Sequence, residues 1–141
     1  MKVLVLNGPN LNLLGTRLPQ VYGTATLGEV EDRCRRWGEE LGIEVDAFQT
    51  NHEGALIDRI HDAIGRYDAL VINPGALTHY SFALHDAIEA AALPTVEVHI
   101  SDISQRENWR SVSVIAPACI ATVAGMGIAG YRNALEILSG T

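Results

Sequence analysis

The alternation of short apolar runs with longer stretches of helical periodicity constrains the fold of this chain more than any other feature. The runs have the length and branched apolar composition of buried strands, and we expect strands at residues 3–6, 43–48, 69–72, 95–100 and 118–123. We expect helices at residues 27–41, 53–64, 81–92 and 131–138. Strands that alternate with helices are typical of right-handed crossovers, which make the strands parallel and cover both faces of the sheet.

This pattern predicts an α/β fold in a single domain, because 141 residues match the size of one typical domain. For five parallel strands the natural arrangement is a doubly wound sheet in the flavodoxin-like order. Ligands in such sheets bind beyond the carboxyl ends of the strands, near the point where the strand order reverses.

Charge and composition exclude several classes of function. The net charge is −7 and no basic run occurs, so we expect no binding to nucleic acid or to an anionic membrane surface. The one lysine, Lys2, lies at the N-terminus, which argues against Schiff-base catalysis on an interior lysine. Cys34 and Cys119 match no zinc or redox spacing, and the apolar run 3–6 is too short for a signal sequence or a membrane span. We therefore expect a soluble cytoplasmic protein with reduced thiols.

Asparagine and histidine side chains accumulate where the expected strands end. These positions fall within residues 7–10, 51–52, 73–79 and 99–102. Turn chemistry explains any single asparagine there. Parallel strands, however, bring their carboxyl ends to one edge of the sheet, so the accumulation predicts a polar ligand site at that edge.

Glu97 and His99 are two residues apart on one expected strand and therefore point to the same side. A carboxylate beside an imidazole favours the imidazolium, which makes a competent general acid. The alternative is a purely structural ion pair. A metal site built from His79, His85 and His99 lacks a recognised ligand spacing, so we expect no metal.

The connection at residues 8–24 is long for a loop between a strand and a helix, where about 2–6 residues are usual. It contains a cation, Arg17, and a phenol, Tyr22. Because the segment 11–14 is rich in leucine and tends to pack, we interpret residues 11–24 as an active-site lid rather than a disordered excursion.

Residues 125–130 read GMGIAG, which matches GxGxxG after an apolar strand. The motif lies near the end of the chain without a second βαβ half, so helix entry and close packing explain it better than a nucleotide site. We expect no cofactor.

Four segments carry a resemblance to a known family. They are NGPNLNLLGTRLPQVYG at 7–23, INPGALTHYS at 72–81, EVHISDISQRENWR at 97–110 and GMGIAGY at 125–131. In this order, and over essentially the whole chain, they resemble the type II 3-dehydroquinate dehydratases. The resemblance implies a flavodoxin-like homododecamer of four trimers that uses neither metal nor Schiff base. The implied reaction is the anti dehydration of 3-dehydroquinate to 3-dehydroshikimate, in the shikimate route to chorismate and the aromatic amino acids or in quinate breakdown.

The resemblance also implies catalytic roles. Tyr22 looks like the base that takes the C2 proton, and Arg17 looks like the lid residue that keeps this phenol ionised. Asn10 looks like the residue that holds a water against the enolate. His99 looks like the acid that protonates the departing C1 hydroxyl, with Glu97 as its partner.

A second set of residues looks like the substrate-binding set. The backbone amides of Ile100 and Ser101 look like a nest for the substrate carboxylate. Asp86 looks like a group that a neighbouring subunit of the trimer contributes. The other side chains that look like substrate or lid-side contacts are Asn73, His79, Arg106 and Arg110.

The chain departs from the family pattern at a few positions. Leu18 replaces an acidic residue in the lid, and Asp102 replaces an asparagine beside the expected carboxylate nest. A carboxylate at position 102 would repel an acidic substrate unless it is paired. His85, Val114 and Ala116 also replace the family's usual residues.

Two other interpretations stay open at this point. The first is a non-catalytic or repurposed relative that binds a cyclic polyol carboxylate, as Leu18 and Asp102 suggest. The second is a flavin or nucleotide module, because flavodoxin-like folds often bind such groups. The complete set of acid and base residues favours the dehydratase.

Overall fold

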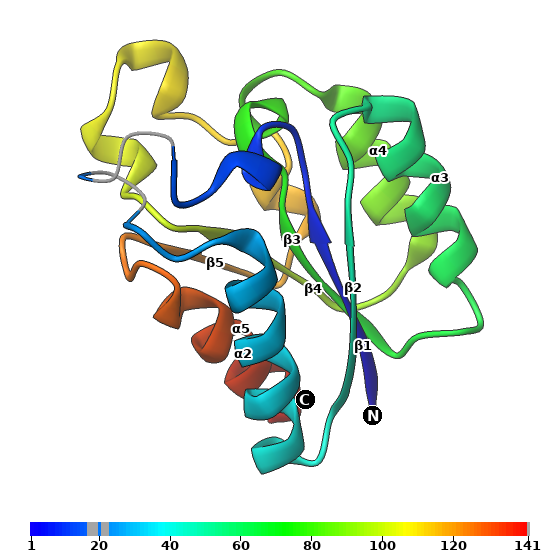
Figure 1. Ribbon diagram of the computed structural model, residues 1–141. Helices are drawn as coiled ribbons and strands as arrows, with labels where there is room; N and C mark the ends of the chain where they lie inside the picture. Colours follow the sequence, from blue (N-terminus) through cyan, green and yellow to red (C-terminus); the bar gives the residue numbers. More distant parts are fainter. Residues whose placement is uncertain (17–19, 21–22, 141) are drawn as a thin grey trace.

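The computed structural model describes residues 1–16, 20 and 23–140, and it shows one sheet between two layers of helices (Figure 1). The strands are β1 Lys2–Asn7, β2 Glu44–Gln49, β3 Ala69–Asn73, β4 Thr95–His99 and β5 Ala121–Ala124. All pairings are parallel, and the strand order is β2-β1-β3-β4-β5. The predicted α/β fold, a doubly wound five-stranded sheet in flavodoxin-like order, is therefore confirmed.

The helices divide between the two faces of the sheet (Figure 1). Their bounds are α2 Leu27–Leu41, α3 Glu53–Ala63, α4 Phe82–Ala91 and α5 Ala129–Ser139. Helices α2 and α5 cover one face, and α3 and α4 cover the other. None of the described helices combines the length and the apolar character that crossing a membrane requires.

Each central strand supplies both cores, because successive side chains of a strand point to opposite faces. In β1, Val3 and Val5 pack in the cluster under α2 and α5. Leu4 and Leu6 pack in the cluster under α3 and α4. This burial on both faces explains why the strand reads as an unbroken apolar run rather than as an alternating one.

Local side-chain bonds fix the helix ends. The Thr26 hydroxyl accepts a hydrogen bond from the Glu29 N–H at 3.2 Å, and Gly42 ends α2 in the left-handed region at φ 73°. The Ser81 hydroxyl accepts from the Leu84 N–H at 3.0 Å and donates to Glu53 Oε2 at 2.5 Å. Ser81 therefore caps α4 and also ties it to α3.

The fifth strand differs from its predicted range of 118–123. Residues Ala116–Ala118 form a 3₁₀ helix with Pro117 in its first turn, and the strand begins only at Ala121. The Cys119 N–H donates to the Ala116 carbonyl at 3.0 Å, a turn bond that is incompatible with strand pairing there. This turn is not evident from the sequence, because the apolar run 118–120 is typical of a strand, and the single proline before it is a weak signal for a turn.

The GMGIAG motif serves as a helix entry with close packing, as predicted. Gly127 has φ 62°, and α5 starts at Ala129, two residues before the predicted start. A Cβ on Gly130 would lie 3.4 Å from side-chain atoms of both Val98 and Val123. Helix α5 therefore packs closely on the sheet at this glycine, where a Cβ would just reach contact distance.

Candidate active site

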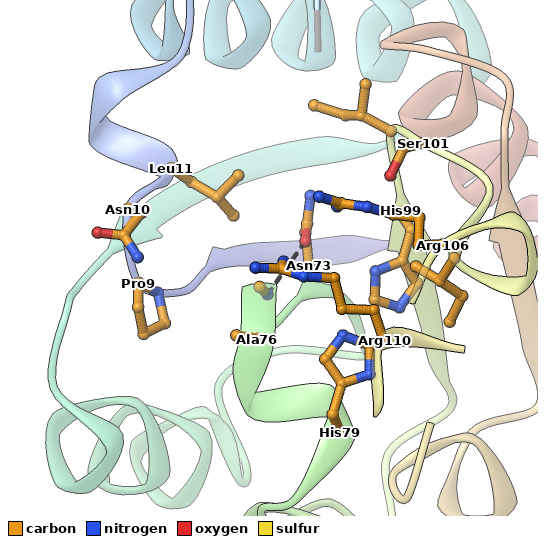
Figure 2. A pocket seen from close by; sticks show the side chains of 13 residues that line it. Pro9, Asn10, Leu11, Asn73, Ala76, His79, His99, Ser101, Arg106 and Arg110 are labelled. Carbon is orange, nitrogen blue, oxygen red and sulfur yellow. Dashed lines mark hydrogen bonds between the residues drawn. The ribbon is translucent and has the colours of Figure 1, made fainter. Parts of the chain in front are cut away.

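A pocket lies beyond the carboxyl ends of β1, β3 and β4, at the edge where the sequence predicts a ligand site (Figure 2). Its cavity has a volume of about 140 Å³. The predicted residues that line it are Asn10, Asn73, His79, His99, Ile100, Ser101, Arg106 and Arg110. Lining residues that the sequence reasoning missed are Pro9, Leu11, Gly75, Ala76 and Ile103. These are apolar or small residues, whose types carry no chemical signal.

Two loops, which follow β1 and β3, meet at one wall of the pocket. A Cβ on Gly8 would lie 2.5 Å from the Pro74 carbonyl oxygen, and a Cβ on Gly75 would lie 2.9 Å from the Pro9 carbonyl oxygen. Only glycine fits such backbone contacts. The contact brings Asn10 to the pocket, and its N–H donates to Asn51 Oδ1 at 3.0 Å. Asn10 itself has φ 70°, a left-handed conformation that asparagine tolerates better than most residues.

Asn73, at the end of β3, is held by a buried network. Its Nδ2 donates to the Tyr131 hydroxyl at 3.0 Å, and that hydroxyl donates to Asn7 Oδ1 at 2.6 Å. Asn73 Oδ1 accepts from the Gly75 N–H at 3.2 Å. The amide orientation is therefore fixed, and one Nδ2 proton is left for a ligand. Burial raises the pKa of the Tyr131 phenol, which stays protonated.

His79 is held in one tautomer. Its Nδ1 lies 2.7 Å from the Val112 carbonyl oxygen, which can only accept, so Nδ1 carries the proton. Burial lowers the pKa of His79, so the ring is neutral and Nε2 has a free lone pair. The ring also packs edge-on against Trp109, with the ring centres 5.7 Å apart.

His99 and Glu97 form the predicted pair on β4. Nε2 of His99 is hydrogen-bonded to Oε2 of Glu97, and both side chains are buried. Burial alone would favour the neutral acid, but the hydrogen bond and charge of His99 and the hydroxyls of Thr78 and Ser113 outweigh it and lower the pKa of Glu97. Because Glu97 takes Nε2, the other ring nitrogen, Nδ1, remains for a ligand.

Arginines line the pocket, although the chain as a whole is acidic. Arg106 and Arg110 both line it, and no aspartate or glutamate is among the described residues that do. The Arg110 guanidinium stacks on Trp109 at 4.0 Å from the ring centre, and its Nε lies 3.6 Å from Glu107 Oε2. Arginine side chains bind carboxylates through charge-assisted hydrogen bonds.

Comparison with known proteins gives one consistent result. A model of the family described as class II dehydroquinase matches residues 1–139. The chain belongs to the class II dehydroquinase family.

Relatives named 3-dehydroquinate dehydratase are similar over nearly their whole length. One from Caldicellulosiruptor bescii is 55% identical over 138 residues, which cover 97% of this chain and 95% of the relative. One from Pseudomonas aeruginosa, named 3-dehydroquinate dehydratase 2, is 56% identical over 134 residues, which cover 95% and 90%. The crystal structure of a type II dehydroquinase from Propionibacterium acnes superposes with a TM-score of 0.96 at 43% identity, over 99% of this chain and 97% of that one.

Asp102, where this dehydroquinase departs from the family pattern, is paired within its own loop. Its Oδ1 accepts from the Ser104 N–H at 3.0 Å and from the Ser104 hydroxyl at 2.7 Å. The side chain caps the 3₁₀ helix Ile103–Gln105 and does not line the pocket. The carboxylate is therefore hydrogen-bonded within its own loop and outside the pocket lining, and its effect on an acidic ligand stays a prediction.

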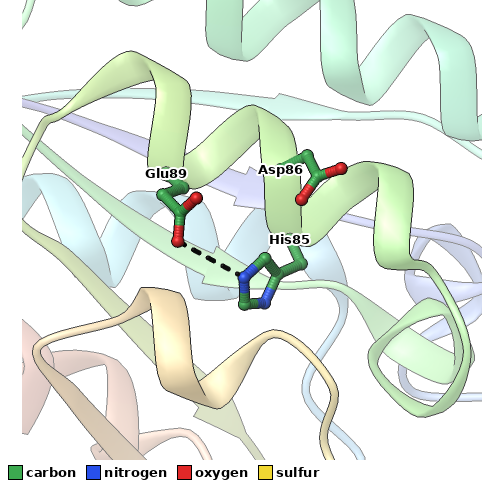
Figure 3. A group of neighbouring side chains, drawn as sticks. All are labelled: His85, Asp86 and Glu89. Carbon is green, nitrogen blue, oxygen red and sulfur yellow. Dashed lines mark ion pairs between the residues drawn. The ribbon is translucent and has the colours of Figure 1, made fainter.

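Asp86 lies on the surface of α4 and does not line the pocket of its own chain. Together with His85 and Glu89 it forms the one cluster within the described part of the chain whose ligand atoms could reach a single metal ion, all within 4.8 Å of one another (Figure 3). His85 Nε2 lies 3.5 Å from Glu89 Oε2, an ordinary pair on one helix face. The structure does not bring the triad His79, His85 and His99 together, since the His85 Nδ1 bonds to the Val114 carbonyl at 2.8 Å.

Arg17 and Tyr22, the two lid residues of the predicted catalytic set, lie outside the described residues. The described part of the predicted lid begins with the 3₁₀ helix Leu11–Leu13 and includes Leu14. Leu11 and Leu14 are buried as expected, whereas Leu13 is exposed.

Proposed function

We propose that this class II dehydroquinase is a 3-dehydroquinate dehydratase, a hydro-lyase that converts 3-dehydroquinate to 3-dehydroshikimate by anti elimination of water. The observation that carries the proposal is His99, bonded to the buried carboxylate of Glu97, in one pocket with two arginines. The names of the close relatives support the same reaction. The pocket supplies an acid, cations for a carboxylate and neutral groups for hydroxyls, which this substrate requires.

The first step is removal of the C2 proton by the Tyr22 phenolate, which leaves an enolate. A tyrosine has a pKa of about 10 in water. For ionisation near neutral pH, the surroundings must stabilise the phenolate by roughly 3–4 kcal/mol. Arg17, closing with the lid at residues 11–24, supplies this by charge. Asn10 holds a water whose dipole stabilises the enolate oxygen.

The second step is loss of the C1 hydroxyl. His99 donates its Nδ1 proton to this oxygen, the C–O bond breaks and water leaves as the enolate electrons form the C1–C2 double bond. Glu97 stabilises the imidazolium before the transfer. The lid carries the base and the sheet edge carries the acid, so the two act from opposite faces of the ring, as an anti elimination requires.

The other lining residues bind the ring substituents. The N–H groups of Ile100 and Ser101 take the carboxylate, with Arg106 on the lid side. Asn73, His79 and Arg110 take the hydroxyls. Asp86 reaches the pocket of a neighbouring subunit within a trimer, and four trimers form a dodecamer.

Turnover by purified variants tests the proposal. We expect Tyr22→Phe to lower kcat at least about 100-fold, because general base catalysis contributes about 10²–10⁴-fold. Tyr80→Phe is the matched control, since Tyr80 is exposed outside the pocket, and it should keep wild-type kcat. Product is followed by the ultraviolet absorbance of its conjugated enone. Equal activity of Tyr22→Phe and the wild type would remove Tyr22 as the base.

A further inference from the structure

The three consecutive residues 112–114 contact His79, Glu97 and the backbone of Thr78, one after another. We call this segment the histidine strap. The Val112 carbonyl accepts from His79 Nδ1 at 2.7 Å. The Ser113 hydroxyl lies 2.8 Å from Glu97 Oε2 and 2.9 Å from Oε1. The Val114 N–H donates to the Thr78 carbonyl at 2.7 Å, which ties the strap to the neighbouring 3₁₀ helix Gly75–His79. The strap therefore reaches both pocket histidines, one directly and one through Glu97.

The Ser113 hydroxyl points its proton at Glu97. The Ala116 N–H donates to Ser113 Oγ at 3.1 Å and occupies one of its lone pairs. Thr78 Oγ1, at 2.8 Å from Ser113 Oγ, has its own close acceptor in Glu97 Oε2 at 2.6 Å. Ser113 Oγ could also donate to Thr78 Oγ1, but it lies within reach of both carboxylate oxygens, and a charged acceptor competes better than a neutral hydroxyl, so we assign both hydroxyl protons to the carboxylate. Such bonds to a charged acceptor are stronger than neutral ones.

The groups around Glu97 favour its anionic form. His99 lies beside it on β4, and Thr122 on β5 adds a third hydroxyl at 3.3 Å from Oε1. Burial and the charge of Glu97 raise the pKa of the Cys119 thiol to about 12, so this neighbour is neutral. Among the described side chains that contact Glu97, His99 is the one that can carry a positive charge.

We propose that the histidine strap assigns different roles to the two pocket histidines. Val112 fixes the proton of His79 on Nδ1, so that Nε2 of the neutral ring is a hydrogen-bond acceptor. Ser113 holds Glu97 as the anion that keeps His99 the proton donor. Ser113 is therefore a positioning residue for the acid. The inference rests on the proposed function and deepens it.

Removal of the Ser113 hydroxyl tests this role. We expect Ser113→Ala to lower kcat about 10-fold with KM changed less than 2-fold, because one hydrogen bond to a buried charge is lost. Ser113→Thr keeps the hydroxyl and should restore most of the activity. Ser113→Cys fills the space with a weak donor and should behave like the alanine variant. Ser111→Ala is the matched control, since the Ser111 hydroxyl donates to the Asn108 carbonyl and not to Glu97.

A second readout separates positioning from simple support of the fold. Carbon NMR of the labelled Glu97 carboxyl should show its protonation midpoint moving to higher pH in Ser113→Ala and unchanged in Ser111→Ala. An unchanged kcat in Ser113→Ala overturns the inference, as does a lower kcat with a lower Tm and an unmoved Glu97 midpoint. If the wild type does not turn over 3-dehydroquinate, the proposed function fails, whereas the Glu97 midpoint still tests the strap.

Discussion

At the scale of single residues, the site depends on which atoms hold protons. His79 and His99 line one pocket, yet a carbonyl holds the first and a carboxylate holds the second. Burial favours the neutral form of His79 and outweighs the carbonyl bond, which by itself raises the pKa of the ring. A carboxylate beside an imidazole favours the charged form. Two residues of one type can therefore serve as acceptor and acid.

The protonation of His79 is directly measurable. Its pKa is lowered by burial, so the ring should stay neutral as the pH falls through about 6.5, the ordinary value. Nitrogen NMR should show the proton on Nδ1. The neutral ring stabilises the fold above pH 6.5, and this contribution is lost as the pH falls through the lowered pKa. Titration at or above 6.5, or a proton on Nε2, would contradict the assignment.

The residues around Glu97 show where sequence reasoning stops. The pair Glu97 and His99 follows from strand periodicity, because residues two apart share a face. Thr78 and Ser113 reach Glu97 from segments 19 and 16 residues away. Hydroxyls are common in loops, and only the folded chain shows that these two meet one carboxylate.

At the scale of elements, most boundaries follow from local signals. The helix at 27–41 matches its prediction because Thr26 and Gly42 mark both ends. The strand predicted at 118–123 starts late because Pro117 imposes a turn. No local signal predicts the contact between the loops after β1 and β3, because Gly8 and Pro74 are far apart in the sequence and meet only in the folded chain.

The loop contact predicts a sharp difference between two glycines. Gly8→Ala places a Cβ 2.5 Å from the Pro74 carbonyl oxygen, so the backbone must shift. We expect a loss of about 1–3 kcal/mol in the free energy of unfolding, as for other overpacked positions. Gly54→Ala is the control, because its Cβ meets nothing within 4 Å and lies in α3, where alanine is favoured. Denaturant unfolding measures the free energy of unfolding of both variants. Equal values for Gly8→Ala and Gly54→Ala would contradict the contact.

At the scale of the whole molecule, the parallel topology explains why one edge of the sheet carries the chemistry. Strands β1, β3 and β4 end side by side, and each places a polar side chain or loop at the pocket. Glu97 lies on β4 opposite Thr122 of β5, and its buried carboxylate bonds to His99 at this edge. Ionisation of one side chain is therefore coupled to the stability of the entire fold.

This coupling predicts a dependence of stability on pH. The pKa of Glu97 is lowered in the fold, so its contribution is present above the ordinary value and is lost as the pH falls through the lowered one. At pH 7 Glu97→Gln should cost about 3–5 kcal/mol, because a buried pair loses a partner. The variant should also lose less stability than the wild type on acidification. The control Glu89→Gln alters an exposed pair and should change the free energy of unfolding little. Equal losses of stability on acidification in the wild type and Glu97→Gln would refute the coupling.

The central claim is that this class II dehydroquinase removes water from 3-dehydroquinate, and direct turnover tests it. Purified wild-type protein is mixed with 3-dehydroquinate, with a chelator present in one sample and borohydride pretreatment in another, and enone absorbance is followed. We expect the same fast rise in all samples, since the proposed acid and base are side chains and no lysine adduct forms. Absence of turnover by the folded protein would contradict the claim and would favour a relative that binds a cyclic polyol carboxylate without converting it.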